Sequence, residues 1–371
     1  MKTFLWGVLL LVLLLLGSTS VFAGDSTPTI TPAVPSTVLS GQTSSVTALA
    51  WSPDGSLLAS AAGAFDSTDK TARLWRADGT PVATLSGHSA PVVSLAWSPD
   101  GNVLATGGFD QQIGLWSPDG TLIRMIDTQA GIVFKLAWSP DGKILASGSE
   151  ASPTSNTVQW WSADGDLLIT RTTAFSGGKF YNLGWSPDGK FLVGGATSYT
   201  EWRADGTEVF SDEGCASCTP QWGFAWSPDG SRWAIGNESG KVTIYATDGR
   251  QIAAVWDNYG GADVLAWSPD GKLLIDGASV WSADGRLVNI LSDGSNISVL
   301  AWSPNGKLIA GSNGWSNAPI NAIALWDTTF HQIAPLKGHS APVASLAWSP
   351  DGKILASGSR DNTIRLWQIT S

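Results

Sequence analysis

The pentapeptide Trp348-Ser349-Pro350-Asp351-Gly352 decides the fold of this chain, because eight versions of it recur along the sequence at intervals of 35 to 47 residues. Seven copies have the same five residues, and the copy at Trp302 has asparagine in place of aspartate. Neighbouring copies lie 35 to 47 residues apart, and a period of about this length is typical of stacked supersecondary units rather than one irregular core. The copies begin at Trp51, Trp97, Trp138, Trp185, Trp226, Trp267, Trp302 and Trp348.

The last copy shows how one repeat is built. The run from Pro342 to Trp348 is apolar, and the Ser-Pro-Asp-Gly segment that ends it is a turn, because proline fixes φ and glycine accepts a positive φ. A second strand is predicted from Lys353 to Ser359 and a third from Thr363 to Trp367. In most copies another turn, such as Ala77-Asp78-Gly79, then precedes a fourth strand. Each repeat is therefore expected to form a four-stranded antiparallel sheet.

The two ends of the repeat region complete each other. Residues Ser36 to Gln42 match Val82 to His88 in register, which predicts a fourth strand without a blade before it, and the last repeat ends at Ser371 with three strands. Stacked sheets leave no blade exposed when they close into a ring, and the N-terminal strand would close this one. We predict an all-β, eight-bladed propeller over residues 36–371. Seven blades with a detached repeat is the alternative, because the copy at Trp267 is the shortest.

These repeats resemble the WD-repeat β-propeller family over roughly residues 36 to 371. The resemblance rests on the Ser-Pro-Asp-Gly turns, on Gly87-His88 and Gly338-His339, and on the third-strand aromatic residues. Among the third-strand aromatic positions, the name-giving Trp-Asp pair occurs only at Trp326-Asp327. The resemblance implies a non-enzymatic scaffold that binds a protein, a peptide or another ligand. The third-strand aromatics are Trp75, Trp116, Trp161, Trp202, Tyr245, Trp281, Trp326 and Trp367.

Two repeats also contain the residues that form a buried hydrogen-bond chain in that family. A histidine paired with an aspartate could be catalytic, but its repetition in two blades at identical spacing favours a structural role. In the other six copies the histidine is absent, and Gln42, for example, stands in its place. We expect those blades to lack the complete chain and to be held by tryptophan packing. The chains implied are Asp110, His88, Thr106 and Trp116, and Asp361, His339, Ser357 and Trp367.

Composition excludes some classes of partner. The formal net charge is −10, and no basic stripe exists that could follow a nucleic acid backbone. Most of the 21 tryptophans occupy the periodic positions, so they are core residues rather than a cofactor site. We expect no cofactor and no metal ion, and we expect a monomer.

The N-terminus predicts export. Lys2 precedes an apolar stretch from Phe4 to Leu16, which is shorter than the roughly 20 residues that span a bilayer and is followed by small residues. Residues 1–23 are therefore predicted to be a signal peptide, with an uncleaved anchor as the alternative, and residues 24–35 a Thr/Pro-rich linker. We expect a secreted, bacterial family member that is periplasmic or extracellular, without a membrane span in the mature chain.

The only two cysteines are Cys215 and Cys218. They lack the βαβ context of a redox motif and the further ligands of a zinc site, so in an oxidising compartment we expect a small disulfide. No nucleophile elbow or phosphate-binding glycine loop occurs.

A partner is expected on one face of the ring. The connections between strands two and three, and from one repeat to the next, carry every insertion, and variable loops on a rigid scaffold are common binding sites. We call this side the loop-rich face and the opposite side the turn face. At the family's contact position in the first strand, Phe134, Tyr181 and Trp222 occur in consecutive repeats, and Phe109 borders them.

Three other functions for these residues stay open. The aromatic rings could plug the channel mouth, or they could stack on sugar rings or a small molecule. Asp263, at the same position in the next repeat, is the candidate acid for a hydrolase.

Overall fold

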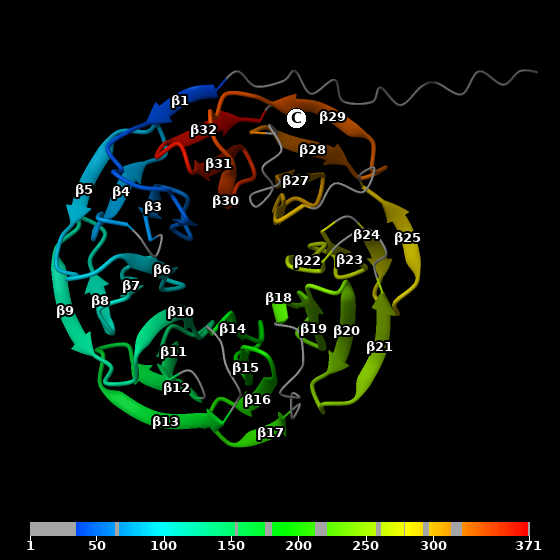
Figure 1. Ribbon diagram of the computed structural model, residues 1–371, viewed down its shortest axis with the longest axis horizontal. Helices are drawn as coiled ribbons and strands as arrows, with labels where there is room; N and C mark the ends of the chain where they lie inside the picture. The colour runs from blue at the N-terminus through cyan, green and yellow to red at the C-terminus, as the bar shows by residue number, and fades with distance from the viewer. Residues whose placement is uncertain are drawn as a thin grey trace, which may run out of the picture.

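The computed structural model describes residues 35–63, 67–152, 155–174, 180–211, 221–256, 261–277, 279–291, 297–312 and 321–369. Within these ranges the regular structure consists of 32 β-strands in eight four-stranded antiparallel sheets, without a helix. The sheets are arranged around a central axis (Figure 1). The chain is therefore an eight-bladed propeller, and the seven-bladed alternative is wrong.

We number the blades in chain order and give their strands from the axis outward (Figure 1). Blade 1 contains β2 (Ala48–Trp51), β3 (Leu57–Ala61), β4 (Ala72–Arg76) and β5 (Pro81–Leu85). Blade 2 contains β6 (Val92–Trp97), β7 (Leu104–Gly108), β8 (Gln112–Trp116) and β9 (Leu122–Asp127). Blade 3 contains β10 (Ile132–Trp138), β11 (Ile144–Ser152), β12 (Ser155–Ser162) and β13 (Leu167–Ala174). Blade 4 contains β14 (Asn182–Trp185), β15 (Phe191–Gly195), β16 (Tyr199–Arg203) and β17 (Glu208–Ser211).

The second half of the ring repeats this order. Blade 5 contains β18 (Gln221–Trp226), β19 (Arg232–Asn237), β20 (Lys241–Ala246) and β21 (Gln251–Trp256). Blade 6 contains β22 (Leu265–Trp267), β23 (Leu273–Asp276), β24 (Ser279–Ser282) and β25 (Leu287–Ile290). Blade 7 contains β26 (Val299–Trp302), β27 (Leu308–Ser312), β28 (Ile323–Asp327) and β29 (Gln332–Leu336). Blade 8 contains β30 (Val343–Trp348), β31 (Ile354–Ser359), β32 (Ile364–Gln368) and β1 (Pro35–Leu39).

Blade 8 closes the ring with the N-terminal strand. β1 pairs antiparallel with β32, so that Val38 lies opposite Arg365 and Leu39 opposite Ile364. Leu39 is buried and Val38 is exposed, as expected for alternating residues of an outer strand. The strand begins at Pro35, one residue inside the segment expected as a linker. Because strands from both ends of the propeller pair with each other, blade 8 has the same four strands as the other blades.

The Ser-Pro-Asp-Gly turns are stabilised by their own side chains. In blade 3, Ser139 Oγ donates a hydrogen bond to Asp141 Oδ1 at 2.7 Å and accepts one from the backbone N–H of Ile144 at 3.0 Å. The glycine that follows has a positive φ in all eight copies, between 67° and 73°, a conformation that favours glycine. Serine, the aspartate or asparagine two residues later, and glycine thus each stabilise the reversal between the first and second strands.

Tryptophans join each blade to the preceding one. The tryptophan that ends the first strand donates its indole N–H to a backbone carbonyl oxygen of the preceding blade, as from Trp348 to Ala301 at 3.2 Å. Seven of the eight tryptophans make this bond, at 2.9 to 3.2 Å. Trp302 is the exception, because its Nε1 is buried and has no hydrogen-bond partner among the described residues. The seam between blades 6 and 7 therefore lacks one hydrogen bond that the other seams have.

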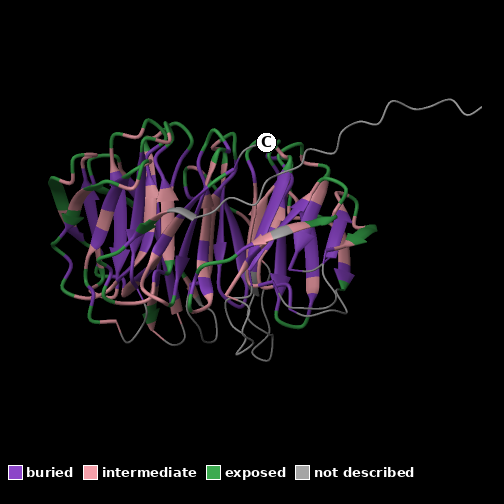
Figure 2. Ribbon diagram, turned by 90° about the horizontal axis from the view of Figure 1, so that it is seen from above, coloured by how far each residue is buried: buried purple, intermediate pink, exposed green. Residues whose placement is uncertain are grey.

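The two faces of the ring differ. The short turns between strands one and two, and between strands three and four, lie along the upper edge in Figure 2 and form the turn face. Buried residues fill the middle of the blades. The first strands begin at the loop-rich face, which positions their first residues around the axis.

Candidate functional site

Two of the residues expected to contact a partner touch each other on the loop-rich face. Phe109 follows β7 of blade 2, and its backbone N–H donates to the carbonyl oxygen of Pro91 at 3.0 Å. Phe134 lies in β10 of blade 3. The two rings meet edge to face, with centroids 5.9 Å apart, and both side chains are half-buried. This pair presents part of its apolar surface to the solvent at the boundary between two blades.

Tyr181 and Asp263 continue the site on blades 4 and 6, in an acidic environment. Burial, followed by the nearby charges of Glu150 and Glu238, raises the pKa of the Tyr181 phenol. Burial and the charge of Glu238 also raise the pKa of the Asp263 carboxyl. Asp263 Oδ1 is buried and accepts no hydrogen bond from the described residues. The three carboxyl groups and the phenol therefore share one negative region.

Two of these carboxylates were missed by sequence reasoning. Glu150 lies near the end of β11, and Glu238 lies in the turn between β19 and β20. Glu150 lies near the end of a second strand and Glu238 just after one, so both emerge on the loop-rich face. This position in the repeat is the signal that could have identified them. Aromatic rings beside carboxylates suit a partner with apolar and cationic groups.

Three expected residues lie partly or wholly outside the described part of the chain. The backbone of Trp222 lies in β18, but its side chain is outside the described residues. Cys215 and Cys218, the expected disulfide, also lie outside the described residues.

The histidines form two hydrogen-bond chains inside blades 2 and 8. In blade 2, His88 Nδ1 lies 2.9 Å from Asp110 Oδ2, and His88 Nε2 lies 2.7 Å from Thr106 Oγ1. Trp116 Nε1 donates to the same hydroxyl at 2.9 Å. The side chains of His88 and Asp110 are almost fully buried, which leaves no room for a substrate.

The second chain has the same geometry. His339 lies 2.9 Å from Asp361 and 2.8 Å from Ser357, whose hydroxyl accepts a hydrogen bond of 2.8 Å from Trp367. Burial alone would raise the pKa of Asp361, but hydrogen bonds from Thr363, the Ser340 backbone and His339 lower it to about 2. Burial lowers the pKa of His339, so a neutral imidazole beside a carboxylate is favoured.

The expectation that blade 1 lacks such a chain is wrong. Gln42 Nε2 donates to Ser60 Oγ at 2.7 Å, and Trp75 Nε1 donates to the same oxygen at 2.8 Å. Arg73 donates to Gln42 Oε1 and, at 2.9 Å, to Asp69. Glutamine with arginine thus takes the place of histidine, and the aspartate is retained. Because Gln42 follows β1, the chain also connects the closing strand to blade 1.

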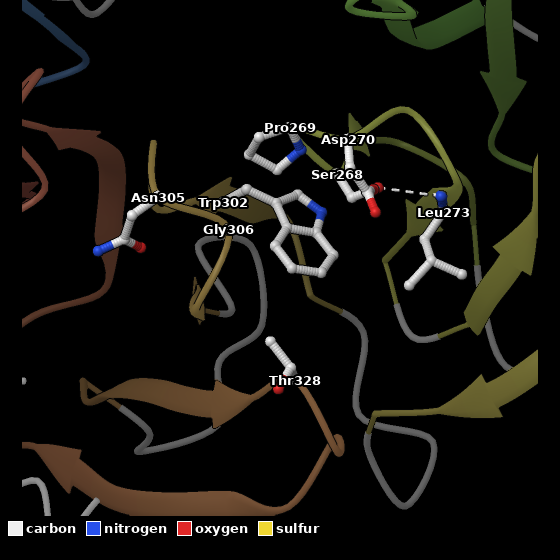
Figure 3. A pocket seen from close by; sticks show the side chains of 8 residues that line it. All are labelled: Ser268, Pro269, Asp270, Leu273, Trp302, Asn305, Gly306 and Thr328. Atoms are coloured by element: carbon white, nitrogen blue, oxygen red, sulfur yellow. Dashed lines mark hydrogen bonds between the residues drawn. The ribbon is translucent and has the colours of Figure 1, made fainter.

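A pocket of about 450 Å³ opens on the turn face, between blades 6 and 7 (Figure 3). Trp302 lies between the Ser-Pro-Asp turn of blade 6 and Thr328 of blade 7 in this view. Trp302 both lines this pocket and has an indole nitrogen without a hydrogen-bond partner among the described residues. Imperfect contact between blades 6 and 7 accounts for the pocket and for the missing hydrogen bond. The lining residues are Ser268, Pro269, Asp270, Leu273, Trp302, Asn305, Gly306 and Thr328.

The described residues contain neither a metal-binding group of side chains nor a helix that could span a membrane. Within those ranges, no three histidine, cysteine, aspartate or glutamate side chains are grouped so that they could hold a metal ion. The same part of the chain contains no helix that is long and apolar enough to cross a membrane.

Four segments of the chain match a known family. The family described as "WD domain, G-beta repeat" matches residues 33–76, 79–117, 120–162 and 330–368. These segments fall on blades 1, 2, 3 and 8, including the closing strand, and on the outer strand β29 of blade 7. No curated protein matches the sequence.

Solved structures share the fold. Sqt1 from Chaetomium thermophilum is similar with a TM-score of 0.76 at 17% identity, over 91% of this chain and 99% of that chain. Sqt1 of the same organism bound to the N-terminus of the ribosomal protein L10 gives a TM-score of 0.74 at 18% identity, over 89% and 98% of the two chains. At these identities the likeness shows the architecture alone.

Proposed function

We propose that this chain is an exported, non-enzymatic WD-repeat scaffold that binds a protein or peptide through its loop-rich face, because four of its segments match the WD-repeat family and it folds as a β-propeller. The observation that carries the proposal is the half-buried aromatic surface of Phe109, Phe134 and Tyr181 beside the carboxylates of Glu150 and Glu238. Half-buried aromatic residues on rigid strands bind partners with little loss of side-chain entropy.

The position of these residues in the chain supports the same proposal. Residues 163–329 fall between the segments that match the WD-repeat family. Tyr181, Trp222, Glu238 and Asp263 all belong to this part. This part keeps the turns and the ring geometry, so the scaffold can be adapted to a partner here without a change of fold.

Peptide binding has a precedent among propellers of this shape. The similar Sqt1 structure holds the N-terminus of a ribosomal protein, which is a peptide ligand. For this chain, the carboxylates on the loop-rich face favour a partner that carries positive charge, and the net charge of −10 acts in the same direction.

The N-terminal sequence supports the proposed export. Lys2, the apolar stretch from Phe4 to Leu16 and the small residues before Ala23 suit a cleavable leader, and a Thr/Pro-rich tether would separate it from β1. Mass spectrometry of the mature protein from the periplasm or the culture medium tests this part. A first residue other than Gly24 would contradict the cleavage position.

The central experiment is replacement of Phe134, Tyr181 and Trp222 together by alanine. We expect the variant to fold and to lose capture of its partner from an extracellular or periplasmic extract, with the captured protein identified by mass spectrometry and its binding repeated with purified components. A matched control variant replaces three exposed apolar residues of the outer strands, Leu122, Ile123 and Leu168, by alanine. Equal capture by both variants would refute the proposal.

Two competing functions predict different experimental results. If the aromatic rings stack on sugars, a glycan array rather than protein capture would give the signal that the triple variant loses. If the site is hydrolytic, Asp263→Asn would abolish turnover in a panel of hydrolase substrates. The pKa of the Asp263 carboxyl is raised by burial and by the charge of Glu238, as a general acid would require.

A further inference from the structure

One seam of the ring departs from a pattern that the other seven share. In those seven, the third-strand residue before the conserved aromatic and a second-strand residue of the next blade belong to one apolar cluster. Between blades 4 and 5, the corresponding residues are Glu201 and Trp233. The seven apolar pairs are Leu74 with Leu104, Leu115 with Leu145, Trp160 with Leu192, Ile244 with Leu274, Val280 with Ile309, Leu325 with Leu355, and Leu366 with Leu58.

Glu201 is poorly compensated in this position. The residue is fully buried, with 0% of its surface exposed. Oε2 accepts a hydrogen bond of 3.2 Å from Trp233 Nε1, while Oε1 is buried and has no hydrogen-bond partner in the described part of the chain. The surrounding side chains are aromatic, including Tyr199 and Tyr245, and Tyr245 stacks on Trp233 at 4.6 Å. A carboxylate there has one donor where water would offer several.

Protonation of Glu201 therefore changes near neutral pH. Burial is the largest cause and raises the pKa of this carboxyl to about 7, against the lowering effect of the Trp233 hydrogen bond. The charged groups that act on it are Asp248, which raises the pKa, and Arg203, which lowers it. The neutral acid suits the aromatic seam, and the anion does not.

The seam is connected to the partner-binding residues by direct contacts. The Tyr199 hydroxyl is hydrogen-bonded to Asn182 Nδ2 at 2.7 Å, and Asn182 follows Tyr181 in the chain. Phe224 stacks on Tyr199, with centroids 6.2 Å apart, and also lies 6.4 Å from Trp233. Phe224 lies two residues after Trp222 in β18. Any loosening of this seam acts on the strands that hold Tyr181 and Trp222.

We propose that Glu201 is a pH-sensitive contact which, when protonated, holds blades 4 and 5 together and keeps Tyr181 and Trp222 in the arrangement that binds the partner. Ionisation places an uncompensated charge in the seam and loosens β14 and β18. The site is then better ordered in mildly acidic than in mildly alkaline surroundings. The regulatory meaning of this contact rests on the proposed function, whereas the contact itself does not.

The test is hydrogen–deuterium exchange of the full chain between pH 5.5 and 8.5, comparing the wild type with Glu201→Gln at each pH. The amide is uncharged and nearly isosteric. We expect equal exchange in β14, β18 and β19 at pH 5.5, and exchange at least about tenfold faster in the wild type at pH 8.5, because the pKa is raised by more than one unit. Strand β7 of blade 2 should show no difference. The same pH dependence in both proteins would overturn the inference.

A second variant keeps the test decisive if the amide does not fold. Glu201→Leu combined with Trp233→Leu recreates the apolar pair of the other seams, such as Leu115 with Leu145. Its exchange in β14 and β18 should be independent of pH after correction for intrinsic rates. The exchange experiment needs no partner, and the alanine variants of the loop-rich face need no change of pH. Failure of this inference and failure of the proposed function are therefore distinguishable.

Discussion

The indole nitrogen of Trp51 donates a hydrogen bond to the carbonyl oxygen of Ala347, 3.1 Å away, and so bonds blade 1 to blade 8 at the ring closure. The same bond recurs at six other seams and is missing at Trp302. The natural sequence thus contains the bonded tryptophan and an unbonded control in equivalent positions.

Replacement of Trp348 by phenylalanine should destabilise the protein more than replacement of Trp302. Both changes remove the same ring atoms, but only Trp348→Phe removes a hydrogen bond, to Ala301. We expect the free energy of unfolding to differ by about 1 kcal/mol between the two variants. Urea denaturation followed by tryptophan fluorescence measures it, and an equal loss in both would show that the indole bond does not stabilise the seam.

The closing strand should contribute stability through its buried side chain. Leu39→Ala removes a side chain that is 2% exposed, in the cluster between blades 8 and 1. We expect a loss of about 2 to 4 kcal/mol. Val38→Ala, on the same strand but 48% exposed, should cost no more than about 0.5 kcal/mol. If thermal denaturation gave the two variants the same stability, β1 would not be packed against the ring.

The hydroxyl of Ser357 should contribute far more to the stability of the protein than the hydroxyl of Ser340, whose backbone belongs to the same hydrogen-bond chain. Ser357→Ala leaves both His339 Nε2 and Trp367 Nε1 buried without a partner. We expect a loss of about 2 to 3 kcal/mol in the free energy of unfolding. Ser340 is exposed and bonds Asp361 through its backbone N–H, so Ser340→Ala should have little effect on urea denaturation. Comparable losses would argue against a continuous hydrogen-bond chain.

The carboxylate of Asp361 should give the protein a specific sensitivity to acid. Its pKa is lowered to about 2 in the folded state, from about 4 in an unfolded chain, so the folded state binds fewer protons in this window. The stabilisation is complete above about pH 4 and is lost as the pH falls through about 2. In Asp361→Asn this part of the pH dependence should disappear from urea midpoints measured between pH 2 and 5. An unchanged acid slope would assign the effect to other carboxyl groups.

The sequence was sufficient for the features that repeat. The turns beginning at Ser52 and Ser349, and the match of Val38 and Leu39 with a fourth strand, predicted eight blades and the closure between β1 and β32. Periodicity carries this information because each blade buries the same faces against its neighbours.

Contacts between different blades were not predictable in the same way. The pair of Glu201 and Trp233 joins third and second strands 32 positions apart, and each residue alone looks like an ordinary variation of a repeat. Arg73 replaces a histidine function from a different position of the blade, so a comparison of aligned columns misses it. Glu150 and Glu238 become neighbours of Tyr181 only when blades 3, 4 and 5 stand side by side. These features depend on side chains that meet across seams rather than on local sequence.

The pairing of β1 with β32 also determines the order of events during synthesis. β1 leaves the ribosome before every blade, and its partner strand leaves after all the others. Leu39 must therefore remain without its neighbours in blade 8 while seven blades assemble. The ring can be completed only when Gln368 has emerged. A nascent chain that stalls earlier would expose the apolar edges of its first and last blades, which makes truncated products ready substrates for chaperones and proteases.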